Sequence, residues 1–380
     1  MSKLKPARLL LPLALLFAFA HTAAAQTDAR RALSALPDSQ AVLYVNAHRI
    51  IHEVLPRVMP PAEYAKMLAE AQKVGFDVRG IDYVAVGARL SDPPPPNNLP
   101  EFVVVLRGNF NADTLLSLGR VAAGAQNITS RSETYGSKTL EIIDLQSLNK
   151  KPASGGTGVG TGEGAGAGES TPAKPMPYPE VAVMALDANT LVAGVPAYVK
   201  AMVDAAGGRG ALKASMVDLA ARDPQALWSL TVEPPPVLVD YLHKVGFPNN
   251  KEANEMIDWV KQVNFSHGMD ALNYTFNASL LTDAPEHASA FSGLVRMGLL
   301  AAQTGLSAEA AKQTPKHKDY AQTRAALDAI KTVVNRTEGN TLLLSFSLPQ
   351  KAVNDLMKKE WVTKKARPTT SRPGRRTRRR

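Results

Sequence analysis

Short apolar runs bounded by polar turn residues recur along the chain, and this pattern predicts β-strands. One run covers residues 41–46 and follows Asp38-Ser39-Gln40, and a weaker copy covers 226–232 and follows Asp223-Pro224-Gln225. Further strands are expected at 81–90, 102–106, 181–186, 190–195, 265–271, 274–281 and 341–347, with a hairpin at 134–143. Many of these strands are neighbours joined by short turns, which favours antiparallel sheet.

Apolar residues at helical spacing lie between the strands and predict helices. We expect them from residue 47 until Pro56 with Pro60-Pro61 interrupts the helix, and at 62–74, with Gly75 as a left-handed cap. Others are expected at 111–121, 196–206, 252–263, 285–303, 318–334 and 350–361, and the lead-in 26–36 is expected to be helical but loosely held. Helices interleaved with hairpins favour an α+β fold over a doubly wound parallel sheet.

Three short sequence echoes occur in the same order in the two halves of the chain. The strand-opening motif Asp38–Val45 returns at Asp223–Leu230, Lys73–Phe76 returns at Lys244–Phe247, and Asn189-Thr190-Leu191 returns at Asn340-Thr341-Leu342. The spans nearly agree once a low-complexity insert in the front half is set aside, although the middle spacing differs. The order of the echoes predicts a duplicated unit, with two related halves forming one body.

Changes in composition mark the expected boundaries. Residues 149–178 consist mainly of Gly, Thr, Ala, Ser and Pro, a composition that cannot bury enough apolar area to offset the entropy of ordering. We therefore expect a disordered insert there. The remaining divisions are a signal peptide at 1–25, the front half at 26–148 and 179–208, the back half at 209–361 and a disordered basic tail at 362–380.

The first 25 residues have a basic start, an apolar run from Leu9 to Ala20 and small residues at Ala23-Ala24-Ala25. This is the pattern of a secretory signal peptide, and the apolar run is short of the ~20 residues that cross a bilayer. We expect cleavage after Ala25 and a secreted or periplasmic protein without a later transmembrane segment. The chain has no cysteine, which excludes disulfides and a lipid-modified Cys.

The net charge of +10 belongs to the two ends of the chain. Residues 1–25 carry three basic side chains and no acid, and residues 364–380 carry nine basic side chains and no acid. The body between them is close to neutral, so it offers no basic groove and a nucleic-acid partner is disfavoured. A composition of 45% hydrophobic and 21% charged residues is ordinary for a globular protein with a real core.

Searches for catalytic and metal-binding patterns give weak candidates. His48 and His52 lie one helical turn apart beside Glu53, but the His-Glu-x-x-His run of zinc proteases is absent, so solvent-facing or hydrogen-bonded histidines are the better interpretation. The glycines of 155–168 lack the Lys-Ser/Thr of a phosphate loop. The Ser-x-x-Lys at Ser147–Lys150 borders the insert. We therefore assign no catalytic, cofactor or metal residue, and an enzyme is disfavoured without being excluded.

The strongest charged feature is the arginine tail: Arg372, Arg375, Arg376, Arg378, Arg379 and Arg380. Guanidinium groups pair bidentately with phosphate, so this tail is a candidate for binding anionic lipid or lipopolysaccharide of the envelope. The alternative is a solvated tail that only aids solubility, or an end that a protease removes.

The strand-opening motif also supports a loose family resemblance. Leu36-Pro37-Asp38-Ser39-Gln40-Ala41-Val42 resembles the Leu-Pro-Asp-x-x-Ala motif with which uncharacterised secreted bacterial proteins open the mature chain before repeated α/β units. The resemblance implies no activity and no functional residues. The first hypothesis is thus an exported, non-catalytic envelope protein for binding or scaffolding, with a basic tail for anionic surfaces. The alternative is an exported hydrolase with a dispersed site between the halves, which predicts a deep polar pocket there.

Overall fold

The computed structural model describes residues 28–73, 75, 77–90, 99–149, 177–246, 250–314, 320–355 and 357. The predicted signal peptide, most of the predicted insert and the basic tail lie outside these residues.

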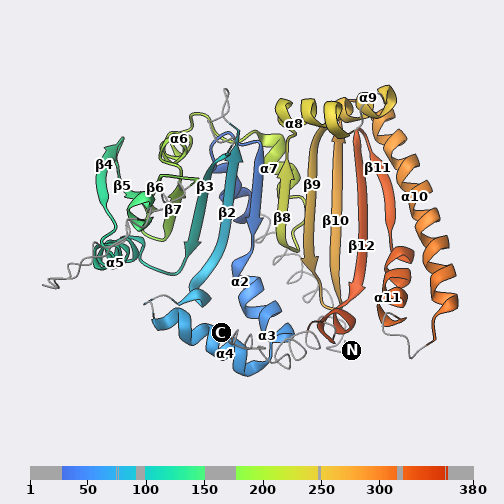
Figure 1. Ribbon diagram of the computed structural model, residues 1–380, viewed down its shortest axis with the longest axis horizontal. Coiled ribbons are helices and arrows are strands. Elements are labelled where there is room, and N and C mark those ends of the chain that lie inside the picture. Colours follow the sequence, from blue (N-terminus) through green and yellow to red (C-terminus); the bar gives the residue numbers. More distant parts are fainter. Residues whose placement is uncertain are drawn as a thin grey trace, which may run out of the picture.

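Twelve strands of the described chain form one antiparallel sheet, in the order β11-β12-β10-β9-β8-β1-β2-β3-β7-β6-β5-β4 (Figure 1). The front strands are β1 (Ala41–Val45), β2 (Ile81–Arg89), β3 (Glu101–Gly108), β4 (Ser130–Tyr135), β5 (Lys138–Asp144), β6 (Glu180–Asp187) and β7 (Thr190–Gly194). The back strands are β8 (Ala226–Val232), β9 (Val260–Met269), β10 (Asn273–Thr282), β11 (Val334–Glu338) and β12 (Thr341–Pro349). The fold is α+β with antiparallel pairing, as the hairpin pattern predicts.

The strand order repeats outward from the centre of the sheet. On one side it runs β1, β2, β3, β7, β6, and on the other β8, β9, β10, β12, β11. In each half the last strand in sequence pairs with the third, and the strand before it pairs with that last strand. The extra strands β5 and β4 extend the front half beyond β6. β1 and β8 pair with each other and join the halves, with Leu43 opposite Leu230. Asn189 and Asn340, from the third sequence echo, both precede the equivalent strands β7 and β12. The two halves therefore share one topology within one continuous sheet.

Helices occupy equivalent places in the two halves. Between the first two strands, the front half has α2 (Ala47–Arg49), the π-helical turn η1 (Ile50–Val54), α3 (Leu55–Val58) and α4 (Pro61–Lys73), and the back half has α8 (Pro236–Tyr241), the π-helical turn η4 (Leu242–Gly246) and α9 (Lys251–Trp259). Figure 1 shows these two sets at opposite ends of the strands, because the central strands β1 and β8 are antiparallel. The remaining labelled helices are α5 (Ala112–Ala125), α6 (Pro196–Ala206), α7 (Ala214–Ala220), α10 (Pro285–Lys312) and α11 (Tyr320–Lys331).

The main core lies on one face of the front half of the sheet. There α6, α7 and the helical residues 28–34 cover side chains of the front strands, including Val42, Ala85, Val103 and Met184. The expectation that 26–36 is loosely held is wrong for its described part, because Ala32, Leu33 and Leu36 have no exposed surface. Their burial makes this segment a structural part of the front half.

The predicted interruption occurs at Met59, which is extended and precedes Pro60-Pro61, but Pro56 itself does not interrupt the helix. The preceding turn, η1, is π-helical, and the amide of Leu55 donates to the carbonyl of Ile50, five residues back. Pro56 then occupies the first turn of α3, where a missing N–H removes no helical hydrogen bond. The π-turn thus lets the helix continue to Val58.

Two predicted helices are shorter than expected because their C-terminal residues pair in β-strands. The predicted helix 252–263 ends at Trp259, and Val260 and Gln262 already pair with β10. The predicted helix 318–334 ends at Lys331, and Val334 begins β11, which pairs with β12. Tertiary pairing overrides helical propensity at both boundaries.

The turn before β1 is fixed by a side chain from α6. The hydroxyl groups of Tyr198 and Ser39 lie 2.5 Å apart, and the Tyr198 hydroxyl donates to the carbonyl of Asp38 at 2.8 Å. Burial raises the pKa of Tyr198 to about 12, so its hydroxyl keeps its proton at neutral pH. The equivalent turn before β8, at Asp223–Gln225, borders the polar groove described below.

Candidate functional site

The back half of the sheet has one polar and one apolar face, because side chains alternate along each strand. Hydroxyl and amide side chains share the first face in the paired strands β8, β9, β10 and β12: Ser229, Thr231, Asn264, Ser266, Asn277, Ser279 and Ser345. Aromatic side chains share the opposite face of the same strands: Trp228, Phe265, Phe276 and Phe346. Each face carries a cavity, and the two differ in chemistry.

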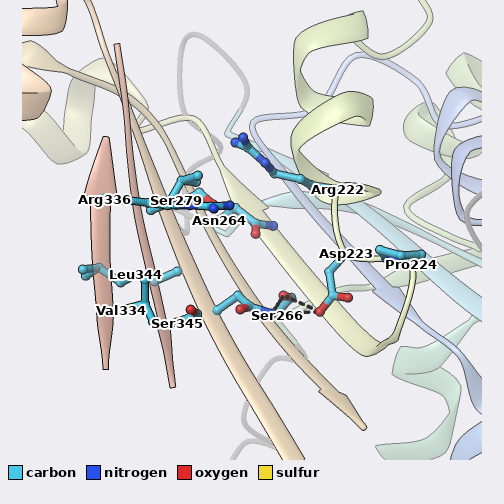
Figure 2. Close-up of a pocket in the computed structure, with 13 residues that line it drawn as sticks. Arg222, Asp223, Pro224, Asn264, Ser266, Ser279, Val334, Arg336, Leu344 and Ser345 are labelled. Atoms are coloured by element: carbon cyan, nitrogen blue, oxygen red, sulfur yellow. Dashed lines mark hydrogen bonds between the residues drawn. The ribbon is translucent and has the colours of Figure 1, made fainter. Parts of the chain in front are cut away.

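The cavity on the polar face is a groove of about 280 Å³ beside the turn that precedes β8. Figure 2 shows Asp223 pointing from this turn toward Ser266. The Asp223 carboxylate accepts hydrogen bonds from the Asn277 amide at 2.9 Å and the Ser266 hydroxyl at 3.3 Å. Its other oxygen accepts a hydrogen bond from the backbone N–H of Gln225 at 2.8 Å. Asp223 therefore joins the turn to β9 and β10, and its oxygens already have donors.

The wall of the groove is an ion-paired network. Arg222 lies 2.7 Å from Glu338, which also pairs with Arg336 at 3.2 Å. Among the described lining residues there is no histidine, lysine or cysteine. Ser266 therefore meets the aspartate directly, without the intervening base that activates a serine nucleophile. This groove holds structure-forming polar contacts and lacks a nucleophile–base pair.

The opposite face carries a row of aromatic rings. Strand pairing aligns Trp228 with His267, His267 with Phe276, and Phe276 with Phe346. The His267 ring stacks on Phe276 with centroids 4.4 Å apart, and Phe276 stacks on Phe346 at 4.8 Å. Four strands spaced about 4.8 Å apart spread this row over about 14 Å. The result is a long, narrow aromatic surface.

α10 and α11 stand beside this row and complete an apolar cleft of about 470 Å³. Val295 and Leu299 of α10 and Ala329 and Ile330 of α11 form its outer wall, and Val333 extends it. In Figure 1 both helices lie next to β11 and β12 at the outer end of the back half. Phe265 is 47% exposed, so the cleft is open to solvent at β9. No charged side chain is among the described residues that line it.

His267 adds a polar atom to the aromatic row. Its Nε2 is buried and has no hydrogen-bond partner in the described chain. Burial lowers the pKa of His267, with the nearby Asp223 charge acting in the opposite direction. The ring is therefore neutral at pH 7, and the aromatic row carries no charge.

A third cavity, of about 580 Å³, lies where the two halves meet. Front-half residues that include Tyr44, Tyr83 and Arg49 line it together with Pro224 and Gln225 of the back half. This is the polar pocket between the halves that the hydrolase hypothesis predicts. Its described lining residues include no serine, threonine or cysteine.

The candidate residues taken from the sequence form no catalytic or metal-binding cluster within the described chain. His48 and His52 are exposed, their rings lie 4.4 Å apart, and His52 Nε2 is 3.0 Å from the carbonyl oxygen of Arg79. The Ser147 hydroxyl donates to the carbonyl of Asp144, and Lys150 lies outside the described residues. The six tail arginines also lie outside. No group of three or more His, Cys, Asp or Glu residues in the described chain is placed to hold a metal ion.

Sequence reasoning missed the apolar cleft, although its parts are visible in the sequence. Trp228, His267, Phe276 and Phe346 each occupy a predicted strand. What one sequence does not provide is the register that aligns them across four strands, or the packing of α10 and α11 beside them. Alternation in β10 could have identified the two faces but not the cleft.

Comparisons with known proteins find no matching family model and no curated protein of similar sequence. Among solved structures, crystal forms III and IV of TP0453 each align with a TM-score of 0.39, at 8% and 9% sequence identity. Each alignment covers 86% of this chain and 97% or 96% of the other. A likeness this low carries no argument about function. No helix in the described part of the chain is long and apolar enough to cross a membrane.

Proposed function

We propose that the protein is an exported, non-catalytic binding protein of the cell envelope that holds a single acyl chain in the apolar cleft. The observation that supports this proposal is the cleft itself, with an uncharged lining that includes Trp228, Phe276 and Phe346. Apolar cavities with few polar groups take apolar ligands. The sheet and the helix pair hold the lining residues in place without the ligand.

The size and shape of the cleft favour an acyl chain. An apolar cavity of about 150 Å³ already binds a benzene-sized molecule. A cleft of about 470 Å³ therefore matches roughly three times that bulk, on the order of 15 carbon atoms. The aromatic row is elongated along the sheet, which suits an extended chain better than a compact ring system. Exposed Phe265 marks the side from which the chain enters.

Affinity should depend on acyl-chain length. We expect saturated fatty acids of 8 to 16 carbons to bind the full chain with affinities that increase about three- to fourfold per methylene until the cleft is full, and then level off. The reason is that each buried methylene contributes about 0.8 kcal/mol. Isothermal titration calorimetry across the series measures this dependence, with a negative heat-capacity change as a second signature of apolar burial.

A matched pair of substitutions in α11 tests the location. Ala329 lines the cleft, whereas Ala326 on the same helix is exposed. Ala329→Phe should fill part of the cleft and weaken binding of the longest chain at least about tenfold. Ala326→Phe should leave it unchanged. Equal affinity for all chain lengths, or no difference between the two variants, would contradict the proposal.

The arginine tail, Arg372 to Arg380, is proposed to hold the protein on anionic envelope surfaces by pairing with lipid phosphates. Deleting residues 364–380 is expected to abolish retention on vesicles that contain an anionic phospholipid, because the rest of the chain is close to neutral. Cosedimentation at low and high salt measures it, since screening weakens such contacts. Uncharged vesicles are the control, and equal retention of the truncated chain on anionic vesicles would refute the role of the tail. Fatty-acid binding should survive the deletion.

The hydrolase alternative receives less support. In the groove, the Ser266 hydroxyl donates directly to the Asp223 carboxylate. In the junction cavity, Arg49 pairs with Glu53 at 3.2 Å and donates to the carbonyls of Gln225 and Met269, both at 2.8 Å. These contacts tie the two halves together. Among the described lining residues, neither cavity places a serine, threonine or cysteine beside a histidine or lysine.

A further inference from the structure

The junction cavity contains polar groups that the fold itself leaves unused. Tyr44 of β1 and Tyr83 of β2 line it and are only 4% and 7% exposed. Neither phenol oxygen forms a hydrogen bond within the described chain, so both are free to accept one from a ligand in the cavity. The rings lie 5.9 Å apart. Two largely buried tyrosine side chains whose hydroxyl groups have no partner in the described chain therefore line the same cavity.

Two carboxylates also lack a partner. Asp28, from the N-terminal helix, and Asp82, from β2, line the cavity, and neither forms an ion pair or hydrogen bond within the described residues. Asp82 would normally face away from its neighbour Tyr83. The pairing of β2 with β3 shifts register between Ile81 and Tyr83, and this bulge allows both residues to line the same cavity.

The cationic side chains in the cavity already have counter-charges. Arg49 is paired with Glu53, and Arg107 lies 3.4 Å from Asp187. His48 is the remaining basic residue of the lining, and it is exposed. The unpaired charge in the lining is therefore negative and comes from Asp28 and Asp82. Burial raises the pKa of Tyr44, and the Asp28 charge raises it further, so this phenol keeps its proton. Burial also raises the pKa of Tyr83.

We infer that this cavity is a binding site for a primary organic ammonium ion. The N–H groups of such an ion can donate to the two carboxylates and to the phenol oxygens, and charge-assisted bonds of this kind are the stronger ones. The aromatic rings add cation–π attraction. A cavity of about 580 Å³ has room for a small alkylamine. The site is separate from the apolar cleft, and this inference does not depend on the proposed function.

Binding of 1,4-diaminobutane to the full chain tests the inference, measured by isothermal titration calorimetry at low salt. We expect saturable binding that weakens as ionic strength rises, because two exposed carboxylates contribute. Tetramethylammonium, which has no N–H donor, should bind at least about tenfold more weakly. Butyrate, an anion of similar length, should not bind.

Variants locate the site. Asp82→Asn keeps the shape of the side chain and removes its charge, so it should weaken diaminobutane binding about tenfold or more. Tyr44→Phe keeps the buried ring and removes one acceptor, and should weaken binding several-fold. The matched control is Asp240→Asn on α8, an exposed carboxylate outside the cavity, which should change affinity less than twofold. Circular dichroism and thermal melting confirm that each variant folds.

Three results would overturn the inference. One is the absence of saturable diaminobutane binding to the wild-type chain. Another is an unchanged affinity in folded Asp82→Asn. The third is binding of tetramethylammonium as strong as that of diaminobutane. Asp82 and Tyr44 do not line the apolar cleft, so both variants should bind fatty acids like the wild type. Measuring fatty-acid binding in the same samples therefore distinguishes failure of this inference from failure of the cleft proposal.

Discussion

Leu33→Ala is expected to lower the free energy of unfolding by about 2–5 kcal/mol, the usual cost of truncating a buried leucine. Leu33 lies in the helical segment 28–34, has no exposed surface, and belongs to the cluster that includes Val42, Met184 and Met202. Removing three carbon atoms there loses their burial and leaves a cavity. The surrounding sheet and α6 come from distant parts of the chain, so they can collapse into it only partly.

Urea denaturation followed by circular dichroism measures this loss as a lower midpoint at similar slope. Leu294→Ala is the matched control, because Leu294 on α10 is 46% exposed and its truncation should change stability by less than about 1 kcal/mol. If both variants lose the same small amount, the N-terminal segment is not part of the core. Loss in the Leu33 variant alone supports the packing described here.

The N-terminal segment shows where sequence patterns stop being informative. Residues 28–36 contain Ala29, Ala32, Leu33 and Leu36 at helical spacing, so a helix is predictable. Whether that apolar stripe is covered depends on a partner far away in sequence. In the structure Leu36 and Leu212 are joined by a backbone hydrogen bond, and Pro37 bridges to Ala211. These long-range contacts make the segment a core helix, and the local sequence pattern does not reveal them.

Strands were easier to predict than helix ends. Hairpins such as β6–β7 carry local turn signals at Asp187 and Asn189, and the first and third sequence echoes mark equivalent strands of the two halves. At Val260 and Val334 the local pattern continues as a helix, but pairing with β10 and β12 satisfies the backbone instead. The long-range pairing of β1 with β8, which joins the halves, has no local signature at all.

The candidate sites were less predictable than the fold, for the same reason. Strand alternation separates Asn264 and Ser266 from Phe265 and His267, so two chemically different faces are readable from β9. Which residues of other strands lie beside them depends on register. Asp82 is a stronger example, because a bulge that the sequence does not reveal brings it into the same cavity as Tyr83.

The related halves have diverged in what their equivalent strands bury. In the front half, α6 and α7 cover an apolar face that includes Val42, Ala85 and Val103. In the back half, the corresponding face holds Asn264, Ser266 and Asn277, and the apolar ring row has moved to the opposite face beside α10. One half therefore provides the main core, and the other provides the cleft. The proposed acyl-chain site therefore lies apart from the main core, in the other half of the same sheet.

The junction of β7 with β3 permits no side chain at Gly194. A Cβ atom placed there would lie 2.2 Å from the carbonyl oxygen of Phe102 and 2.9 Å from the Cα of Val103. Both contacts are with backbone, so no side-chain rotation relieves them. Gly194 also begins the turn into α6, because the amide of Val195 donates to that same Phe102 carbonyl at 3.0 Å. The strand pairing and the start of α6 therefore depend on one close backbone approach.

Gly194→Ala is therefore expected to lower the free energy of unfolding by more than about 3 kcal/mol, at or beyond the upper end for overpacked cores, because the backbone of β3 must move. Gly298→Ala makes the same chemical change in α10, where no atom lies within 4 Å of the added Cβ, and should raise stability by about 0.5–1 kcal/mol through helix propensity. Urea denaturation of the two variants and the wild type measures the change in the free energy of unfolding for each variant. A loss below about 1 kcal/mol in the Gly194 variant would mean that β7 and β3 do not approach as closely as described, whereas opposite signs support both the sheet junction and the exposed face of α10.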